Sequence, residues 1–387
     1  MNTTNTTEDY RTLESAYIMP AFSREIMITK GSGCTVTDAD GKEYLDLVAG
    51  IAVCSTGHCH PKIVGAIARQ AAELIHCSNL YYVPGQGTLA RRIVEIAGLK
   101  GASKAFFSNS GAEAMEGALK LARVRTGKKE FIACEHGFHG RTMGSLACTH
   151  KPAIRDPFMP LQPPCRFVPY GDPEAIRAAI TGDTAAVVVE PVQGESGVII
   201  PPPGYLKQVR EICDETDVLL ILDEIQTGMG RTGTWFAYQQ EGITPDIVTI
   251  AKGIASGFPM GAIVAREGLA FGKSEHGSTF AGGPLACAAA LATIEVISEI
   301  LPGVQEKGRR LGDALASHTP RVKGLMIGVS LGDACAAVQK GCAERGLLVN
   351  CAADGNLRLV PPLTITSAEI DRAAGIINET ISKQPRS

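Results

Sequence analysis

The stretch Val218-Leu219-Leu220-Ile221-Leu222-Asp223-Glu224-Ile225-Gln226 joins five aliphatic residues to two carboxylates and, two residues on, an amide. An apolar run of this length without polar alternation is typical of a β-strand that is covered on both faces. Four other runs share this character and also end at a polar motif: residues 105–107, 131–134, 185–189 and 247–250. The five runs predict neighbouring strands of one buried sheet.

The segments between these runs have the spacing of amphipathic helices. In residues 112–125, apolar side chains recur at Met115, Ala118, Leu119 and Ala122, the i, i+3, i+4 and i+7 positions of one helical face. Alternating strands and helices indicate an α/β fold with a mostly parallel sheet.

The two flanks of the chain differ from its centre. Residues 1 to about 50 carry short strand-like pieces around an Asp40-Gly41 turn, and residues from about 290 onward carry a helix and then short strands near 325–331 and 357–360. We therefore expect a large central domain over residues 51–290. A smaller α+β domain would combine residues 1–50 with residues 291–387.

Composition excludes several classes of protein. The 387 residues are 45% hydrophobic and 20% charged, with a net charge of −3, so no basic excess indicates nucleic-acid binding. The polar, acidic start lacks a signal sequence, and the longest apolar stretch, residues 285–294, is shorter than the ~20 residues of a membrane span. Twelve scattered cysteines without a CxxC pair indicate reduced, mostly buried thiols and a cytoplasmic protein.

Polar motifs begin where the five apolar runs end. In a parallel sheet, ligands bind in the crevice at the carboxyl ends of the strands, so five motifs at that edge predict one site. The motifs start at Ser108, Glu135, Glu190, Asp223 and Ala251.

The motif Ser108-Asn109-Ser110-Gly111-Ala112 directly precedes a helical pattern. Free N–H groups and the positive end of the helix dipole would face the crevice there, which suits a phosphate. Ser and Asn also favour the N-cap position of any helix, so a purely structural cap is the alternative.

Asp223 and Lys252 each follow a buried strand. A carboxylate at such a position needs a cation or donor, although a helix cap would also explain it. A partly desolvated lysine has a lowered pKa and can act as a Schiff-base nucleophile, whereas most lysines simply lie on the surface. A phosphate cradle, an acid for a ring nitrogen and a reactive lysine together fit pyridoxal phosphate.

Two other motifs carry less weight. Residues 228–233 match GxGxxG, but an acidic segment separates them from their strand and no clear helix follows, which disfavours a nicotinamide dehydrogenase. His58-Cys59-His60 resembles a metal motif, but no second ligand pair has suitable spacing. We expect no metal.

Taken together, the motifs resemble those of class III (ω-amino acid) pyridoxal-phosphate aminotransferases of fold type I. The resemblance runs from about residue 21 to 381. Its motifs include Gly50-Ile51-Ala52-Val53, Asn109-Ser110-Gly111-Ala112-Glu113-Ala114, Phe138-His139-Gly140-Arg141-Thr142, Glu190-Pro191-Val192-Gln193-Gly194-Glu195, Leu222-Asp223-Glu224-Ile225-Gln226, Ala251-Lys252-Gly253, Gly277-Ser278-Thr279-Phe280 and Leu357-Arg358-Leu359-Val360-Pro361-Pro362.

The resemblance implies roles for the residues around the cofactor. Lys252 would hold pyridoxal phosphate covalently and move the reacting proton, while Asp223 would keep the ring nitrogen protonated. The remaining cofactor contacts would come from Ser110, Gly111 and Ala112 at the phosphate, Phe138 and Ile225 on the ring faces, and Gln226 at the ring hydroxyl. Thr279 would reach the phosphate in a neighbouring subunit, which implies a homodimer with shared active sites.

The resemblance also implies how substrates bind. Arg141 and Arg358 would clamp substrate carboxylates, a surface salt bridge being the alternative for either; Glu195 would pair with Arg358 until an α-carboxylate displaces it, and Ser278 would contact substrate. The implied reaction transfers the δ-amino group of N-acetylornithine to 2-oxoglutarate, giving N-acetylglutamate semialdehyde and glutamate.

Other activities remain open at this stage. Ornithine, succinyldiaminopimelate or 4-aminobutyrate could be the amine donor, since one methylene or acyl group changes binding by only ~1–3 kcal/mol. Residues 50–53 favour acetylornithine over ornithine, because ornithine enzymes normally carry a tyrosine nearby. A catalytically silent protein of the same fold is the remote alternative. The loops at Ala255-Ser256 and Ala281-Gly282-Gly283-Pro284 depart from the usual family pattern.

Overall fold

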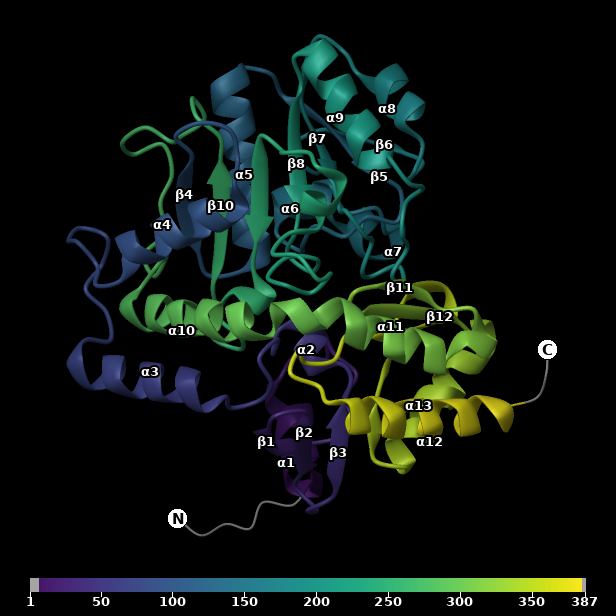
Figure 1. Cartoon of the computed structure of the whole chain (residues 1–387). Helices are drawn as coiled ribbons and strands as arrows, with labels where there is room; N and C mark the ends of the chain where they lie inside the picture. The colour runs from purple at the N-terminus through teal and green to yellow at the C-terminus, as the bar shows by residue number, and fades with distance from the viewer. Residues whose placement is uncertain (1–6, 385–387) are drawn as a thin grey trace.

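The computed structural model describes residues 7–384, and a seven-stranded sheet lies at its centre (Figure 1). The strand order is β4-β10-β9-β8-β7-β5-β6, and only β10 runs antiparallel to its neighbours. The strands are β4 (Lys104–Ser108), β5 (Glu130–Cys134), β6 (Cys165–Val168), β7 (Thr184–Val189), β8 (Leu219–Asp223), β9 (Ile247–Ile250) and β10 (Gly261–Ala265). All five predicted strands and the mostly parallel sheet are confirmed.

Strands β6 and β10 were not predicted from the sequence. β6 is one of the two edge strands and is only partly buried, so its residues lack a continuous apolar run. β10 is fully buried but consists of Gly, Ala, Ile and Val, a composition that suits a buried helix as well as a strand.

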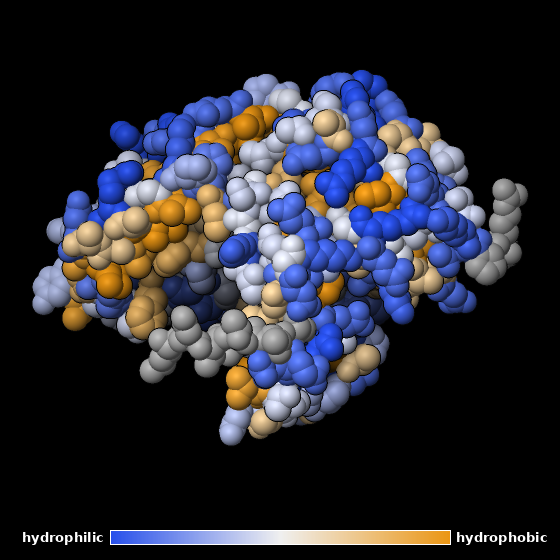
Figure 2. Space-filling view, turned by 90° about the horizontal axis from the view of Figure 1, so that it is seen from below, coloured by the Kyte–Doolittle hydropathy of each residue, from blue (hydrophilic) through white to orange (hydrophobic). Residues whose placement is uncertain are grey.

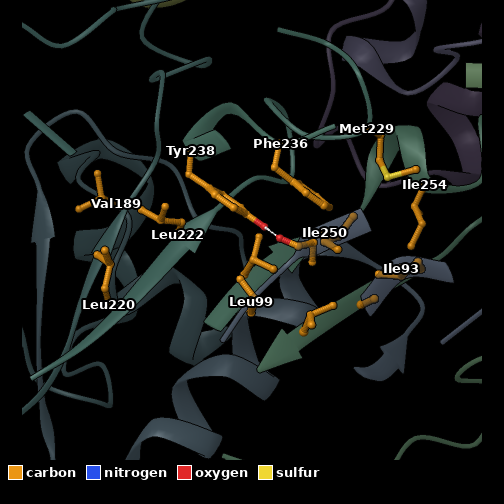
Figure 3. Close-up of a cluster of buried hydrophobic side chains, with 14 of the residues drawn as sticks. Ile93, Leu99, Val189, Leu220, Leu222, Met229, Phe236, Tyr238, Ile250 and Ile254 are labelled. Atoms are coloured by element: carbon orange, nitrogen blue, oxygen red, sulfur yellow. Dashed lines mark hydrogen bonds between the residues drawn. The ribbon is translucent and has the colours of Figure 1, made fainter. Parts of the chain in front are cut away.

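The two faces of the sheet pack into separate cores, which explains why its strands are apolar without alternation. In β8, Leu220 and Leu222 belong to the core on one face, whereas Leu219 and Ile221 belong to the core on the other. Figure 3 shows part of the first core, where the Tyr238 hydroxyl donates a hydrogen bond of 2.6 Å to the carbonyl of Ala97.

Helices cover both faces. On one side α5 (Gly111–Thr126) packs against β7, β9 and β10, and its observed bounds confirm the predicted helix. On the other side α10 (Pro284–Ile300) packs against α3 and α4 and crosses the molecule below the sheet (Figure 1). The other helices of the first 220 residues are α1 (Thr7–Tyr17), α2 (Ala49–Ala52), α3 (Pro61–Glu73), α4 (Gln86–Ala97), α6 (Met143–Ala147), α7 (Pro152–Arg155), α8 (Pro173–Ala179) and α9 (Tyr205–Thr216).

Two four-stranded sheets flank the central one. The first has the order β1-β2-β3-β13, so the C-terminal strand β13 pairs with the N-terminal strand β3. The second has the order β11-β12-β15-β14. Their strands are β1 (Ile28–Ser32), β2 (Thr35–Asp38), β3 (Glu43–Asp46), β11 (Arg321–Lys323), β12 (Met326–Ser330), β13 (Leu347–Leu348), β14 (Asn350–Cys351) and β15 (Asn356–Leu359).

Both chain ends share one core. Leu45 and Leu47 pack in a cluster with side chains of α11 (Val304–Ala314), α12 (Cys335–Glu344) and α13 (Ser367–Ser382). This arrangement agrees with a unit built from both ends, although the domain bounds 1–50, 51–290 and 291–387 stay a prediction.

The structure bears on two expectations from the composition, one about membrane spans and one about thiols. One described stretch, Pro284–Ala314, is long and apolar enough to cross a membrane by composition, but 56% of its most apolar window is buried and α10 packs as a core helix. The expectation that all thiols are free is wrong at one pair, since Cys335 and Cys351 form a disulfide; the other ten cysteines are free. The pair was not predictable because no sequence motif marks it: the chain runs along α12 and back through β13 to β14 before the two cysteines meet.

Candidate active site

A cavity of about 380 Å³ opens at the carboxyl ends of the parallel strands. It gathers residues from all five polar motifs, as the sheet geometry predicts. Ten of the thirteen predicted site residues line it: Ser110, Gly111, Ala112, Phe138, Arg141, Glu195, Asp223, Ile225, Gln226 and Lys252.

The N-terminus of α5 forms one wall of this cavity. Ser110 is the N-cap, and its hydroxyl accepts a hydrogen bond of 3.2 Å from the amide of Glu113. The structural cap is therefore present, and it leaves the Gly111 and Ala112 N–H groups without partners in the helix. A Cβ on Gly111 would lie 3.0 Å from the Ile225 side chain, so any larger residue would crowd Ile225 at this wall of the cavity.

Asp223 ends β8 and pairs with a residue that the sequence analysis did not single out. His139 Nδ1 lies 2.7 Å from Asp223 Oδ2, and both side chains are buried. Burial alone would lower the pKa of His139, but the hydrogen bond and charge of Asp223 outweigh it and raise the pKa to about 9. The position of His139 between Phe138 and Arg141 in one motif was the signal that could have identified it.

The second oxygen of Asp223 is also held. Oδ1 accepts hydrogen bonds from the Ile225 amide at 3.1 Å and from the Thr249 hydroxyl at 3.2 Å. The carboxylate is thus oriented by three donors from three segments of the sheet edge, which is an arrangement for a fixed negative charge beside the cavity.

Lys252 follows β9 and reaches the same cavity. Its φ of +47° is unusual for a residue with a side chain, and such strain concentrates at functional positions. Burial lowers the pKa of Lys252, and the positive charge of Arg358 adds to that effect, although Glu195 opposes it. The amine is therefore more readily neutral than a surface lysine.

Arg358, on β15, lies behind the cavity wall and pairs with Glu195. The Nη1–Oε1 distance is 2.6 Å, and the arginine side chain is only 1% exposed. Burial raises the pKa of Glu195, but the charges of Arg358 and Lys252, together with hydrogen bonds from Arg358 and Gln226, outweigh this effect and lower the pKa overall. The surface-salt-bridge alternative is wrong for Arg358, because the arginine is buried.

Arg141 contrasts with Arg358. It is exposed at the cavity rim, its guanidinium 5.9 Å from the centre of the Phe138 ring, and it forms no salt bridge within residues 7–384. A carboxylate entering the cavity meets this cation unpaired.

Ser278 and Thr279 do not line the cavity. Ser278 Oγ accepts a hydrogen bond of 2.9 Å from Asn109, next to the α5 N-cap, and Thr279 is exposed. The Asn79 amide joins their loop to residues 78–82 by donating to the Ala281 carbonyl at 2.9 Å.

Glu190 is a further cavity residue without a predicted role. Burial raises its pKa to about 7, although the positive charge of His139 opposes the shift. Its two side-chain oxygens accept hydrogen bonds from the backbone amides of Phe138 and Gly194. Glu190 therefore joins the loop that carries Phe138 to the loop that carries Glu195.

This fold, with a lysine, an acid and a helix N-terminus in one crevice, is that of a pyridoxal-phosphate-type aminotransferase. The class-III aminotransferase family matches residues 18–381, and the chain belongs to this family. This confirms the resemblance and the enzyme class that the sequence motifs indicated.

Individual relatives and solved structures extend the comparison. The chain is 54% identical to the acetylornithine aminotransferase of Methanosarcina mazei over 95% of its own length and 94% of that protein. Its structure resembles the ornithine aminotransferase of Toxoplasma gondii, whose active site holds partially occupied PLP, with a TM-score of 0.92, 31% identity and coverage of 97% and 94%. The acetylornithine aminotransferase of Elizabethkingia anophelis matches with a TM-score of 0.86, 30% identity and coverage of 98% and 100%.

Proposed function

We propose that the protein transfers the δ-amino group of N-acetylornithine to 2-oxoglutarate, giving N-acetylglutamate 5-semialdehyde and glutamate, as in arginine biosynthesis. The observation that carries the proposal is the cavity that Lys252 and Asp223 line, with one open arginine at its rim and a second arginine, paired with Glu195, behind its wall. The identity to named acetylornithine aminotransferases, between 45% and 54% over nearly the whole chain, supports this substrate.

The residues present fit pyridoxal phosphate. The α5 N-terminus offers free amides and a positive dipole for a phosphate, and the space beside Gly111 is one that a side chain would fill. Asp223, oriented by His139 and Thr249, suits a protonated ring nitrogen. Pyridoxal phosphate, when bound, supplies a ring that takes up the electron pair left when the substrate carbon loses its proton.

Within this arrangement Lys252 would hold the cofactor's aldehyde carbon and afterwards move a proton at its Nζ atom. Its lowered pKa favours the neutral amine that this requires. Phe138 and Ile225 would enclose the ring, and Gln226 would contact its hydroxyl group.

Two carboxylate sites would serve two kinds of substrate. Arg141 would bind the α-carboxylate of acetylornithine or the far carboxylate of glutamate. Arg358 would bind the α-carboxylate of glutamate or 2-oxoglutarate after Glu195 has moved aside. Because Glu195 holds Arg358 when no such carboxylate is present, the amine donor would meet a neutral pair rather than a second free cation.

We also propose a homodimer, with Thr279 reaching the partner's phosphate site and Ser278 contacting substrate. Large hydrophobic side chains are exposed around the two joined loops, including Leu80 at 85%, Tyr82 at 103% and Phe280 at 65%. Figure 2 shows a broad hydrophobic area on the side of the molecule where α3 and α10 lie. Contiguous exposed apolar surface of this kind marks an interface. The cytoplasmic location stays a prediction.

Steady-state kcat/KM values for acetylornithine, ornithine, succinyldiaminopimelate and 4-aminobutyrate test the substrate. We expect at least tenfold preference for acetylornithine, because Val53 rather than a tyrosine lines the cavity. A marked preference for unacetylated ornithine, the substrate named for the Toxoplasma gondii structure, would overturn the assignment.

A further inference from the structure

Besides Glu195, two amide side chains accept hydrogen bonds from Arg358: Gln226, whose Oε1 lies 3.5 Å from Nη1, and Asn350. Asn350 Oδ1 accepts hydrogen bonds from Arg358 Nε at 3.1 Å and from Nη2 at 2.8 Å. A guanidinium has only donors, so the amide oxygen is the atom that can face it, and the Asn350 NH₂ group donates instead to the Cys351 carbonyl at 3.2 Å.

The position of Asn350 is set by the backbone. Strand β14 pairs antiparallel with β15, and Asn350 is the direct cross-strand partner of Arg358. The strand has only two residues, and it is attached to α12 through the Cys335–Cys351 disulfide and through a hydrogen bond of 2.8 Å from the Cys351 amide to Gln339. Asn350 therefore meets Arg358 wherever Glu195 lies.

The decisive property of Asn350 is that it carries no charge. Within residues 7–384, Glu195 is the sole carboxylate paired with Arg358. The other acceptors of Arg358, which are Asn350 Oδ1, Gln226 Oε1 and the Gly194 carbonyl, are neutral. When Glu195 moves aside, a buried guanidinium is left oriented but without a counter-charge. An unpaired buried charge is costly, so an incoming carboxylate is strongly favoured there.

We propose that Asn350 is a positioning residue that orients Arg358 without neutralising it, and that this neutral contact confers affinity for the α-carboxylate of the amino acceptor. The proposal rests on the proposed function only in assigning that carboxylate to 2-oxoglutarate and glutamate. A carboxylate at position 350 would hold Arg358 equally well but compensate its charge permanently.

Asn350→Asp tests this directly, with Gln339→Glu as the matched control. The control makes the same amide-to-carboxylate change on an exposed residue beside β14 and retains an acceptor for the Cys351 amide. Two measurements are needed: the dissociation constant of glutarate by calorimetry, which does not depend on turnover, and the rates of the two half-reactions with acetylornithine and with 2-oxoglutarate.

We expect Asn350→Asp to weaken glutarate binding and to raise the KM for 2-oxoglutarate by about tenfold or more, since charge-assisted hydrogen bonds are among the strong ones. The acetylornithine half-reaction should change by less than about twofold, and Gln339→Glu should resemble the wild type. Unchanged glutarate affinity in Asn350→Asp, or equal losses in both half-reactions, would overturn the proposal.

Asn350→Ala decides the question if the aspartate variant does not fold. It retains the charge of Arg358 but not its orientation, so glutarate should bind about threefold to tenfold more weakly; wild-type affinity would overturn the proposal. If the wild type does not use acetylornithine, the proposed function fails, but weaker glutarate binding by Asn350→Asp would still support the role of Asn350.

Discussion

The two arginines at the cavity, Arg141 and Arg358, differ in their exposure and in their pairing. Arg141 stands exposed at the rim without a salt bridge in the described part of the chain, whereas Arg358 is buried and held by Glu195 and Asn350. Arg141 is available to any carboxylate, whereas Arg358 becomes available only when Glu195 moves away from it. One cavity can thus accept substrates with one or with two carboxylates.

Lys252 should matter equally to both substrates. Lys252→Ala should lower the rates of both half-reactions by a factor on the order of 10³ or more, because the lysine supplies both the covalent attachment and the proton transfer. Rapid-scanning absorbance with each substrate measures the two rates. A cofactor-dependent visible band that is the same in the wild type and in Lys252→Ala would instead support a catalytically silent protein.

The arginines themselves should separate the substrates. Arg358→Gln should reduce kcat/KM for 2-oxoglutarate about 10- to 100-fold and leave acetylornithine nearly unaffected, because a charged, bidentate contact is worth about 1.5–3 kcal/mol. Arg141→Gln should impair both substrates by a similar factor. Half-reaction kinetics of the paired variants, each the control of the other, test the contrast, and identical profiles would contradict it.

The Asp223–His139 pair should also serve both substrates equally, and it gives a prediction about the pH dependence of stability. The folded-state pKa of His139 is raised to about 9, so the stability from this pair is fully present below pH ~6.5 and is lost as the pH rises through about 9. A difference of 9 − 6.5 pKa units corresponds to roughly 3–4 kcal/mol at ~1.4 kcal/mol per unit.

Thermal unfolding between pH 7 and pH 10 provides the measurement. The wild type should lose stability more steeply with pH than His139→Gln, which can hydrogen-bond but cannot carry the charge. Parallel curves for the two proteins would contradict a charged His139. A change in the ratio of the two half-reaction rates in His139→Gln would contradict the expectation that His139 serves both substrates equally.

The smallest effect should come from substituting Glu195, the carboxylate that pairs with Arg358. Glu195→Ala leaves Arg358 permanently uncompensated, so preference should shift about tenfold toward glutamate and away from the ω-amine donor. The ratio of kcat/KM values for glutamate and acetylornithine measures this shift. An unaltered ratio would remove Glu195 from the mechanism.

Much of the central sheet was predictable because its signals are local. The run from Val218 to Leu222 is apolar on both faces, and the structure divides it between two cores as expected. The same runs placed ten predicted residues around one cavity, since parallel strands end at one edge. Strands β6 and β10 escaped prediction because edge exposure and small residues weaken the pattern.

The amino-acid sequence by itself determined the sheet, the position of the site and the chemistry of its motifs, because hydrophobic periodicity and motif spacing are properties of short segments. Only the tertiary structure decided which polar atoms meet: His139 with Asp223, Asn350 with Arg358, and Cys335 with Cys351. The first pair joins segments 84 residues apart, the second lies across two neighbouring strands, and the third closes a segment without a recognisable motif. A hydrogen bond or disulfide requires atoms placed to within a fraction of an ångström, and that precision comes from the packed fold.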